Sequence, residues 1–212
     1  MVNPIIKICG ICDSGMAEQA ARAGANLIGV VFHPASQRHA NIEQAAEISA
    51  ATKQAGASPV AVFVDQNAET MQSICETTDI QIVQLHGEAA RHYHRFIPNK
   101  FKRIFALNVT DAGELQTDKG VNYLDQDRDF ILIDHVTPGQ GVALNLLDFR
   151  YDLNFPLILA GGLTISNVAS AVKRLQPHGV DVSSGVESSP GNKDIFLIQQ
   201  FIAAARSNSH AA

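Results

Sequence analysis

Short apolar runs recur along this chain, and most are followed by a polar turn and then by residues at helical spacing. The runs are rich in Ile, Val, Leu and Phe and cover residues 5–8, 27–32, 59–64, 80–85, 102–107, 130–133, 156–160 and 180–182. The run LIGVVF at 27–32 does not alternate between apolar and polar residues, which is typical of a strand buried on both faces. The pattern therefore predicts eight strands of a parallel sheet, joined by helices.

The helices are predicted from apolar residues at helical spacing, preceded by N-cap candidates such as Asn41, Asn67 and Asn167. They cover about residues 13–23, 41–54, 67–77, 88–96, 168–175 and 194–206. After the fifth strand the pattern weakens to a short helical piece near 112–116, and residues 145–150 can supply a short helix after the sixth strand.

Eight strand-then-helix units with no break in composition predict a compact (β/α)8 TIM barrel. We expect one domain over residues 1–212, with an abbreviated fifth helix and a frayed tail at 207–212. An open dinucleotide-binding sheet is disfavoured, because no G-x-G-x-x-G follows the first strand.

Composition narrows the classes of partner. The chain has 212 residues, a net charge of -5 and no Lys/Arg cluster, so we expect no nucleic-acid partner. No apolar run approaches the roughly 20 residues of a membrane span, and the N-terminus lacks the features of a signal peptide. Three cysteines, an odd number, do not suggest a disulfide framework. We expect a reduced cytoplasmic protein without a membrane partner, and a monomer, since no long apolar surface stripe is present.

The turns after the last two strands suit a phosphate group. Gly161-Gly162 follows the seventh run, and Ser183-Ser184-Gly185 follows the eighth. Glycine lets the backbone approach a ligand closely, and a helix start presents unpaired N–H groups. In (β/α)8 barrels these two loops form the usual phosphate site. The alternative is that both are only tight turns; their occurrence on consecutive strands favours a phosphorylated small molecule as ligand.

Two residues at strand ends are candidates for proton transfer. Cys9 ends the first run and Asp134 directly follows the sixth, so we expect them roughly opposite each other across the barrel mouth. Cys9 and Cys12 also form a C-x-x-C, which leaves a redox dithiol, a zinc site or an inert buried thiol as other interpretations. His86 at the end of the fourth run can be functional or simply fill space, and Arg38 lies in a loop where most arginines are solvated.

Six segments together resemble phosphoribosylanthranilate isomerase. They are KICG at 7–10, GVVFHPASQR at 29–38, VAVFV at 60–64, VQLHG at 83–87, LAGGLT at 159–164 and VDVSSGVESSPGNKD at 180–194. They occur in the family's order and span nearly the whole chain. The resemblance implies the Amadori rearrangement of N-(5′-phosphoribosyl)anthranilate to 1-(2-carboxyphenylamino)-1-deoxyribulose 5-phosphate in tryptophan biosynthesis, without a metal or an organic cofactor.

The resemblance also implies roles for individual residues. Asp134 is then the general acid that opens the ribose ring, and Cys9 is the general base that takes the C2′ proton. Arg38 pairs with the anthranilate carboxylate, while Gln84 and His86 line the pocket. The phosphate lies on the backbone around Gly161-Gly162 and Ser183 to Gly185, as the turns themselves suggest.

Three expectations follow from these roles and from one difference between this sequence and the family's usual pattern. Cys9 has to act as a thiolate, so we expect its pKa to be lowered, with Lys7 as the candidate cation. If the sulfurs of Cys9 and Cys12 can approach, mild oxidation should silence the enzyme. The chain also has Pro138-Gly139-Gln140-Gly141 and later Leu147-Asp148-Phe149, where the family usually shows Gly-Gly-Ser/Thr-Gly and Phe-Asp-Trp. Because of that difference, we expect the loop after Asp134 to close differently over the anthranilate.

Two other functions are consistent with the same barrel. One is a metal-dependent sugar-phosphate epimerase that uses His33, His86 and Asp134 as ligands. The other is a barrel that binds a phosphorylated metabolite without catalysis and serves as a sensor or a subunit. The pairing of Cys9 with Asp134 argues against the second, because binding alone needs neither residue.

Overall fold

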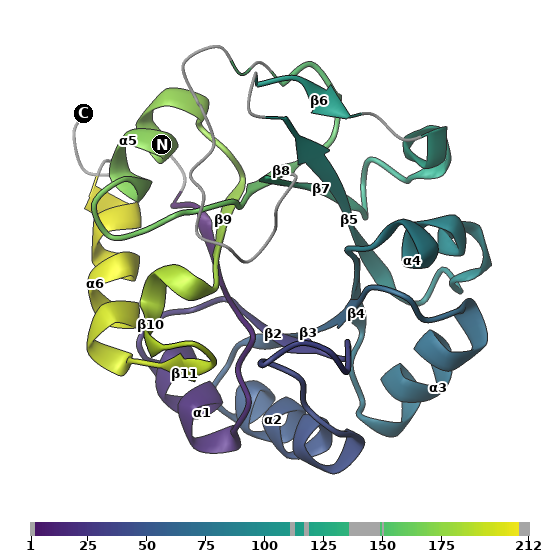
Figure 1. Ribbon diagram of the computed structural model, residues 1–212, viewed down its shortest axis with the longest axis horizontal. Helices are drawn as coiled ribbons and strands as arrows, with labels where there is room; N and C mark the ends of the chain where they lie inside the picture. Colours follow the sequence, from purple (N-terminus) through teal and green to yellow (C-terminus); the bar gives the residue numbers. More distant parts are fainter. Residues whose placement is uncertain (1–2, 111–112, 117–118, 136–148, 150, 208–212) are drawn as a thin grey trace.

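A closed ring of parallel strands forms the centre of the molecule (Figure 1). The computed structural model describes residues 3–110, 113–116, 119–135, 149 and 151–207. In this part of the chain the barrel strands are β1 (Ile5–Cys9), β2 (Leu27–Val31), β3 (Ser58–Phe63), β4 (Ile82–Leu85), β5 (Lys102–Val109), β7 (Phe130–His135), β8 (Leu157–Leu159) and β9 (Gly179–Val182). Each pairs in parallel with its neighbours, and the pairing of β4 with β5 closes the ring. The prediction of a (β/α)8 TIM barrel is confirmed.

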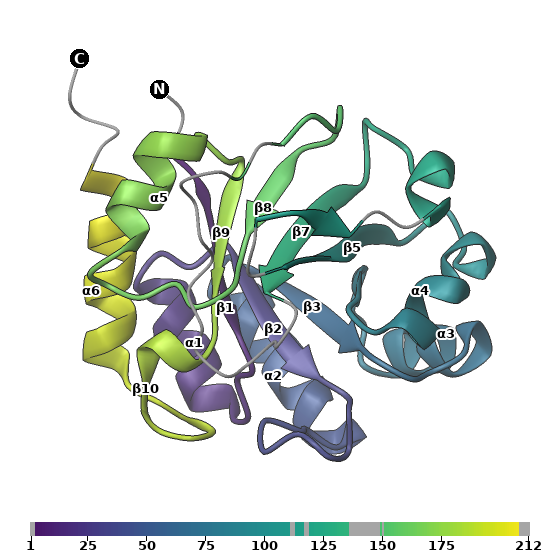
Figure 2. The ribbon, with the colours of Figure 1, turned by 45° about the horizontal axis from the view of Figure 1, so that its top comes forward.

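Helices surround the ring on the outside (Figures 1 and 2). They are α1 (Ser14–Arg22), α2 (Ile42–Gln54), α3 (Ala68–Thr77), α4 (Glu88–His92), α5 (Val168–Leu175) and α6 (Ile195–Arg206). The side chains of Asn41 and Asn67 cap α2 and α3 by accepting hydrogen bonds from Gln44 N and Thr70 N, as the sequence predicts. Within the described residues, no helix has the length and apolar character needed to cross a membrane.

The structure differs from the prediction after the fifth strand. Residues 113–116 contain a bend and the short strand β6 (Leu115–Gln116), so the helical piece expected there is wrong for these residues. The cause is that β5 continues to Val109, and its last residues pair antiparallel with β6. The abbreviated fifth helix is the 3-10 helix η2 (Lys119–Tyr123). Apart from Phe149, the helix predicted at 145–150 lies outside the described residues, as does the tail beyond 207.

Alternation along the strands separates two apolar layers. On β1, Ile6 and Ile8 belong to the core between strands and helices, whereas Cys9 belongs to the barrel interior together with residues such as Val60 and Leu132. The same alternation turns Lys7 inward, where it is fully buried. A buried ammonium needs a partner of opposite charge, so the interior of this barrel must contain a polar site.

Candidate active site

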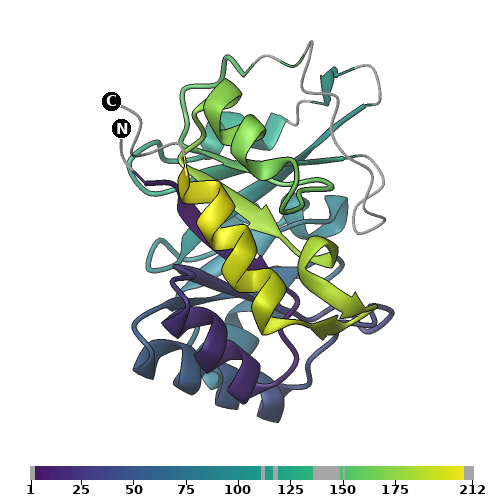
Figure 3. The same ribbon diagram turned by 90° about the vertical axis from the view of Figure 1, so that its left-hand side faces the viewer.

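The predicted site residues gather at the carboxyl ends of the strands. Cys9 is the last residue of β1, Asp134 lies near the end of β7, and β9 and β8 separate these two strands in the ring. Gln84 lies near the end of β4, and His86 directly follows that strand. The glycine and serine candidates lie in the loops after β8 and β9; they are Gly161, Gly162, Ser183, Ser184 and Gly185. Beyond β9, the hairpin of β10 (Glu187–Ser189) and β11 (Asn192–Lys193) projects beside the start of α6 (Figure 3).

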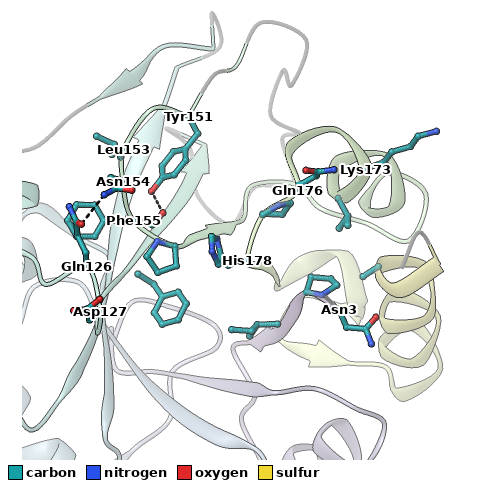
Figure 4. A pocket seen from close by; sticks show the side chains of 17 residues that line it. Asn3, Gln126, Asp127, Tyr151, Leu153, Asn154, Phe155, Lys173, Gln176 and His178 are labelled. Atoms are coloured by element: carbon teal, nitrogen blue, oxygen red, sulfur yellow. Dashed lines mark hydrogen bonds between the residues drawn. The ribbon is translucent and has the colours of Figure 1, made fainter. Parts of the chain in front are cut away.

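A large cavity lies at the other end of the barrel. It has a volume of ≈ 1430 Å³ and is lined by Ile5, Phe130 and Pro156, which begin or precede strands, and by Tyr151 and His178 (Figure 4). Reactions on (β/α)8 barrels take place at the carboxyl ends of the strands, so size does not make this cavity the active site. The cavity at the carboxyl ends, of ≈ 600 Å³, includes Arg38, Gly162, Ser184 and Gly185 among its lining residues.

The Cys9 thiol lies beside a buried ion pair. Lys7 Nζ is 3.0 Å from Asp181 Oδ1, and both side chains are at least nine-tenths buried. Burial lowers the pKa of Lys7, but Asp181 and Cys9 outweigh it, so the net pKa is raised and the ammonium stays charged. Gly29 on β2 makes room for this group: a Cβ there would lie 2.8 Å from Cys9 Sγ and 3.2 Å from Lys7 Nζ.

The pKa of Cys9 corrects one expectation. Burial raises the pKa of the Cys9 thiol, and the Lys7 ammonium lowers it only in part, so the net shift is upward rather than downward. Lys7 is nevertheless the cation that acts most strongly on Cys9, as the sequence suggests. The three cysteines are free thiols, and the Cys9–Cys12 disulfide stays a prediction.

A second polar group links β4 to β7. Gln84 Nε2 is 3.0 Å from His86 Nδ1, and His86 Nε2 is 3.6 Å from Asp134 Oδ2. Burial, together with the charges of Lys7 and Arg91, lowers the pKa of His86 to about 4, so the imidazole is neutral near pH 7. When the Gln84 amide donates to Nδ1, the imidazole proton sits on Nε2 and faces the carboxylate. The imidazole of His86 and the carboxyl group of Asp134 therefore lie side by side at the barrel mouth.

The loops after β8 and β9 form one backbone surface. Gly161 and Gly162 have positive φ angles of 82° and 63°, which side chains rarely allow. A Cβ on Gly185 would lie 2.1 Å from Leu163 O, so the two loops touch directly. Asn167 does not cap α5 as predicted; it accepts from Thr164 N at 2.7 Å and donates to Gly162 O at 2.9 Å. In the described part of the chain, the amides of Gly162, Ser184 and Gly185 have no protein acceptor, which suits an anion.

Arg38 belongs to a network that the sequence alone does not reveal. Its Nε and Nη2 donate to Glu187 Oε1 and Oε2 at 2.7 and 2.8 Å. Lys193 Nζ donates to Glu187 Oε1 at 2.6 Å and to Ser183 O at 3.0 Å. Burial alone raises the pKa of Glu187, but its hydrogen bonds to Arg38 and Lys193 bring it down to about 2. The carboxylate is therefore ionised at every working pH.

Three residues of this site were not singled out from the sequence. They are Asp181, Glu187 and Lys193, all within the segment 180–194. Asp181 could have been found, because a carboxylate between Val180 and Val182 in an apolar strand requires a cation. Glu187 and Lys193 carry no such signal, because charged residues in a loop are usually solvated.

The described residues offer no ligand set for a metal. No group of three His, Cys, Asp or Glu side chains among them could hold an ion. His33, His86 and Asp134 are all described, and His33 Nδ1 instead lies 2.9 Å from Asp65 Oδ2. The metal-dependent epimerase thus loses its proposed ligands.

A (β/α)8 barrel whose mouth holds a thiol beside an ammonium, a carboxyl group beside an imidazole and two loops with exposed backbone amides has the features of an enzyme that acts on a small anionic molecule. The family model of N-(5′-phosphoribosyl)anthranilate (PRA) isomerase matches residues 6–204. The chain belongs to this family.

Individual relatives agree along nearly the whole chain. The isomerase of Rhodopseudomonas palustris (strain BisA53) is 39% identical over 95% of this chain and 95% of its own, and chloroplastic isomerase 1 of Arabidopsis thaliana is 35% identical over 97% and 76%. The crystal structure of the Thermotoga maritima isomerase has a TM-score of 0.81 at 34% identity, covering 96% of this chain and 99% of that chain. An isomerase in complex with reduced 1-(o-carboxyphenylamino)-1-deoxyribulose 5-phosphate has a TM-score of 0.76 at 32% identity, with the same coverage.

Proposed function

We propose that this chain catalyses the Amadori rearrangement of N-(5′-phosphoribosyl)anthranilate to 1-(2-carboxyphenylamino)-1-deoxyribulose 5-phosphate, a step of tryptophan biosynthesis. One observation carries the proposal: a thiol with its own ammonium and a carboxyl group with its own imidazole occupy opposite parts of one barrel mouth. Family membership supports the same reaction.

In the proposed mechanism, Asp134 acts first. It gives a proton to the ribose ring oxygen, the bond from that oxygen to C1′ breaks, and the anilino nitrogen lone pair forms an iminium with C1′. Cys9 then removes the C2′ proton, and the electrons of that bond form the C1′–C2′ double bond and neutralise the nitrogen. The resulting enolamine loses its hydroxyl proton and gains one at C1′ to give the ketone. Side chains carry out the first two proton transfers, and the proposal includes neither a metal nor an organic cofactor.

The environment of Cys9 predicts how the rate depends on pH. Because its pKa is raised overall, the resting group is a thiol, and the adjacent Lys7 ammonium stabilises the thiolate when it forms. We therefore expect kcat/KM to rise with pH above neutrality. A profile that is flat through the neutral and alkaline range would contradict the thiolate base.

The phosphate and the carboxylate of the substrate bind at separate places in the proposed complex. The phosphate accepts hydrogen bonds from the backbone around Gly161-Gly162 and Ser183 to Gly185, and Arg38 pairs with the anthranilate carboxylate. Gln84 and His86 line the pocket. The free amides of the loops and the guanidinium on the same cavity support this arrangement.

Turnover of freshly generated phosphoribosylanthranilate, followed by the loss of its fluorescence, tests the proposal. Wild type, Cys9→Ser and Asp134→Asn are compared with and without chelator, and Cys75→Ser on α3 is the matched thiol control. We expect each site variant to lose about 10²- to 10⁴-fold in kcat, the usual contribution of a positioned acid or base. The control and the chelator should have little effect.

Other outcomes favour other functions. Loss of activity with chelator would favour the metal-dependent epimerase. A folded wild-type protein that binds phosphorylated ligands without turnover would favour a sensor.

We also propose a monomeric, single-domain protein of the cytoplasm. The solved Thermotoga maritima isomerase is dimeric, with monomers generated from it, and Arabidopsis thaliana isomerase 1 is chloroplastic, so both properties vary among relatives. Sedimentation velocity at micromolar concentration distinguishes a monomer of 22.8 kDa from a dimer.

A further inference from the structure

Glu187 holds Arg38 by one edge of the guanidinium. The carboxylate accepts from Nε and Nη2, which is the side-on geometry of a bidentate pair. A guanidinium has five N–H groups, and among the described residues the edge formed by Nη1 and the second Nη2 hydrogen makes no hydrogen bond, so it can bind another carboxylate. Glu187 is nearly fully buried, whereas Arg38 is 17% exposed at the cavity. The pair therefore presents to the ligand a guanidinium that is held in place along one edge and can bind along the other.

The stem of Arg38 is also held in place. A Cβ on Gly10 would lie 2.5 Å from Arg38 Cδ, so the aliphatic part of this side chain lies directly across the turn that follows Cys9. The guanidinium is thus fixed at its base by packing and at its tip by Glu187. Both constraints place it next to the strand that carries the thiol.

Lys193 gives the group its net charge. Arg38 and Glu187 alone would cancel, and Lys193, whose side chain is 2% exposed, makes the sum +1. Lys193 also donates to the carbonyl and, at 3.2 Å, to the hydroxyl of Ser183, which in turn donates to Cys9 O at 3.0 Å. The same ammonium therefore connects Arg38 to the loop after β9.

We propose that Glu187 is a positioning residue for recognition of the substrate's ring carboxylate, and that Lys193 couples this recognition to the phosphate loop. Glu187 orients Arg38 so that its open edge meets the carboxylate, and Lys193 preserves an attractive net charge. The inference rests on the proposed function, in which Arg38 binds the anthranilate carboxylate. It adds a specificity element to that function, directed at the 2-carboxyphenyl group.

The test compares two product analogues by calorimetry: reduced 1-(2-carboxyphenylamino)-1-deoxyribulose 5-phosphate and its counterpart without the ring carboxylate. In Glu187→Gln we expect affinity for the first to fall about 10- to 100-fold, the range for hydrogen bonds to charged groups, and affinity for the second to change less than about threefold. Glu76→Gln, which makes the same change at the exposed pair with Lys100, is the control and should bind both analogues like wild type.

The sign of the effect separates positioning from charge. Glu187→Gln raises the net charge of the group from +1 to +2, so tighter binding of the carboxylate analogue would mean that Glu187 only neutralises charge. Equal weakening of both analogues would assign it a structural role, and unchanged binding would remove any role. Each of these results overturns the inference.

Two further measurements complete the test. Thermal unfolding shows whether Glu187→Gln folds; if it does not, Glu187→Asp, which keeps the charge but shortens the side chain by one methylene, should show the same selective loss. Wild-type turnover of phosphoribosylanthranilate is measured in parallel. Its absence refutes the proposed function, whereas turnover with non-selective variants refutes only the role of Glu187.

Discussion

Gly29→Ala adds one methyl group beside the reacting thiol. The new Cβ would lie 2.8 Å from Cys9 Sγ, 3.0 Å from Cys9 Cα and 3.2 Å from Lys7 Nζ. Carbon and sulfur do not approach this closely without strain, and the second contact is with backbone, which cannot rotate away. The thiol, the ammonium or the β1–β2 pairing must shift by several tenths of an ångström or more.

The expected loss of activity is larger than the loss of stability. Overpacking of a core usually costs about 1–3 kcal/mol, which lowers Tm by several degrees in a protein of this size. A displacement of about 1 Å in a catalytic group can reduce the rate about 100-fold. Movement of Lys7 away from the thiol also removes the interaction that lowers the pKa of Cys9, so thiolate formation should shift to higher pH.

Three measurements check the reasoning: kcat/KM, thermal unfolding, and the pH dependence of Cys9 alkylation by iodoacetamide. Gly15→Ala in the first turn of α1 is the matched control, because it adds the same methyl group at an exposed position. It should leave kcat/KM and the pH dependence of alkylation unchanged and alter stability only slightly, because the new Cβ would meet only the exposed side chain of Asp13, at 3.3 Å from Oδ1. A folded Gly29→Ala protein with wild-type kcat/KM would refute the idea that this space sets the thiol–ammonium geometry.

Two more predictions concern buried ionisable groups. Lys7→Met should lower the free energy of unfolding, measured by urea titration, by about 3–5 kcal/mol, because it leaves Asp181 buried and unpaired. It should also move the ionisation of Cys9 to higher pH. The control Lys100→Met, at an exposed ion pair, should cost less than about 1 kcal/mol in the same titration. His86 has a pKa of about 4 in the folded protein against 6.5 when unfolded, so its contribution is present above pH 6.5 and is lost as pH falls toward 4. Between pH 7.5 and pH 5 the free energy of unfolding should therefore fall less in His86→Gln than in wild type, by at most about 2 kcal/mol, since only the interval from 6.5 to 5 contributes. Equal slopes would show that His86 is not buried in its neutral form.

The local pattern was sufficient for most of the fold. Runs such as LIGVVF fixed the strands to within one or two residues, because a strand buried on both faces must be apolar throughout. Asn41 and Asn67 marked helix starts through contacts three residues away. The failure near 112–116 has a tertiary cause, since β6 exists only because the extended end of β5 offers it a partner.

The candidate site also has features that the local sequence determines and features that tertiary contacts determine. By itself the sequence placed Cys9, Asp134 and the glycine and serine turns at strand ends on one face of the barrel, because strand ends and turn residues are read from short stretches and parallel strands bring their carboxyl ends together. Only the tertiary structure decided that Lys7 pairs with Asp181, 174 residues away, and that Arg38 pairs with Glu187, 149 residues away. It also decided the direction of the Cys9 pKa shift, since burial depends on every strand around the thiol. Spacing along the chain carries information about nearest neighbours, whereas charge and burial are set by residues that only closure of the barrel brings together.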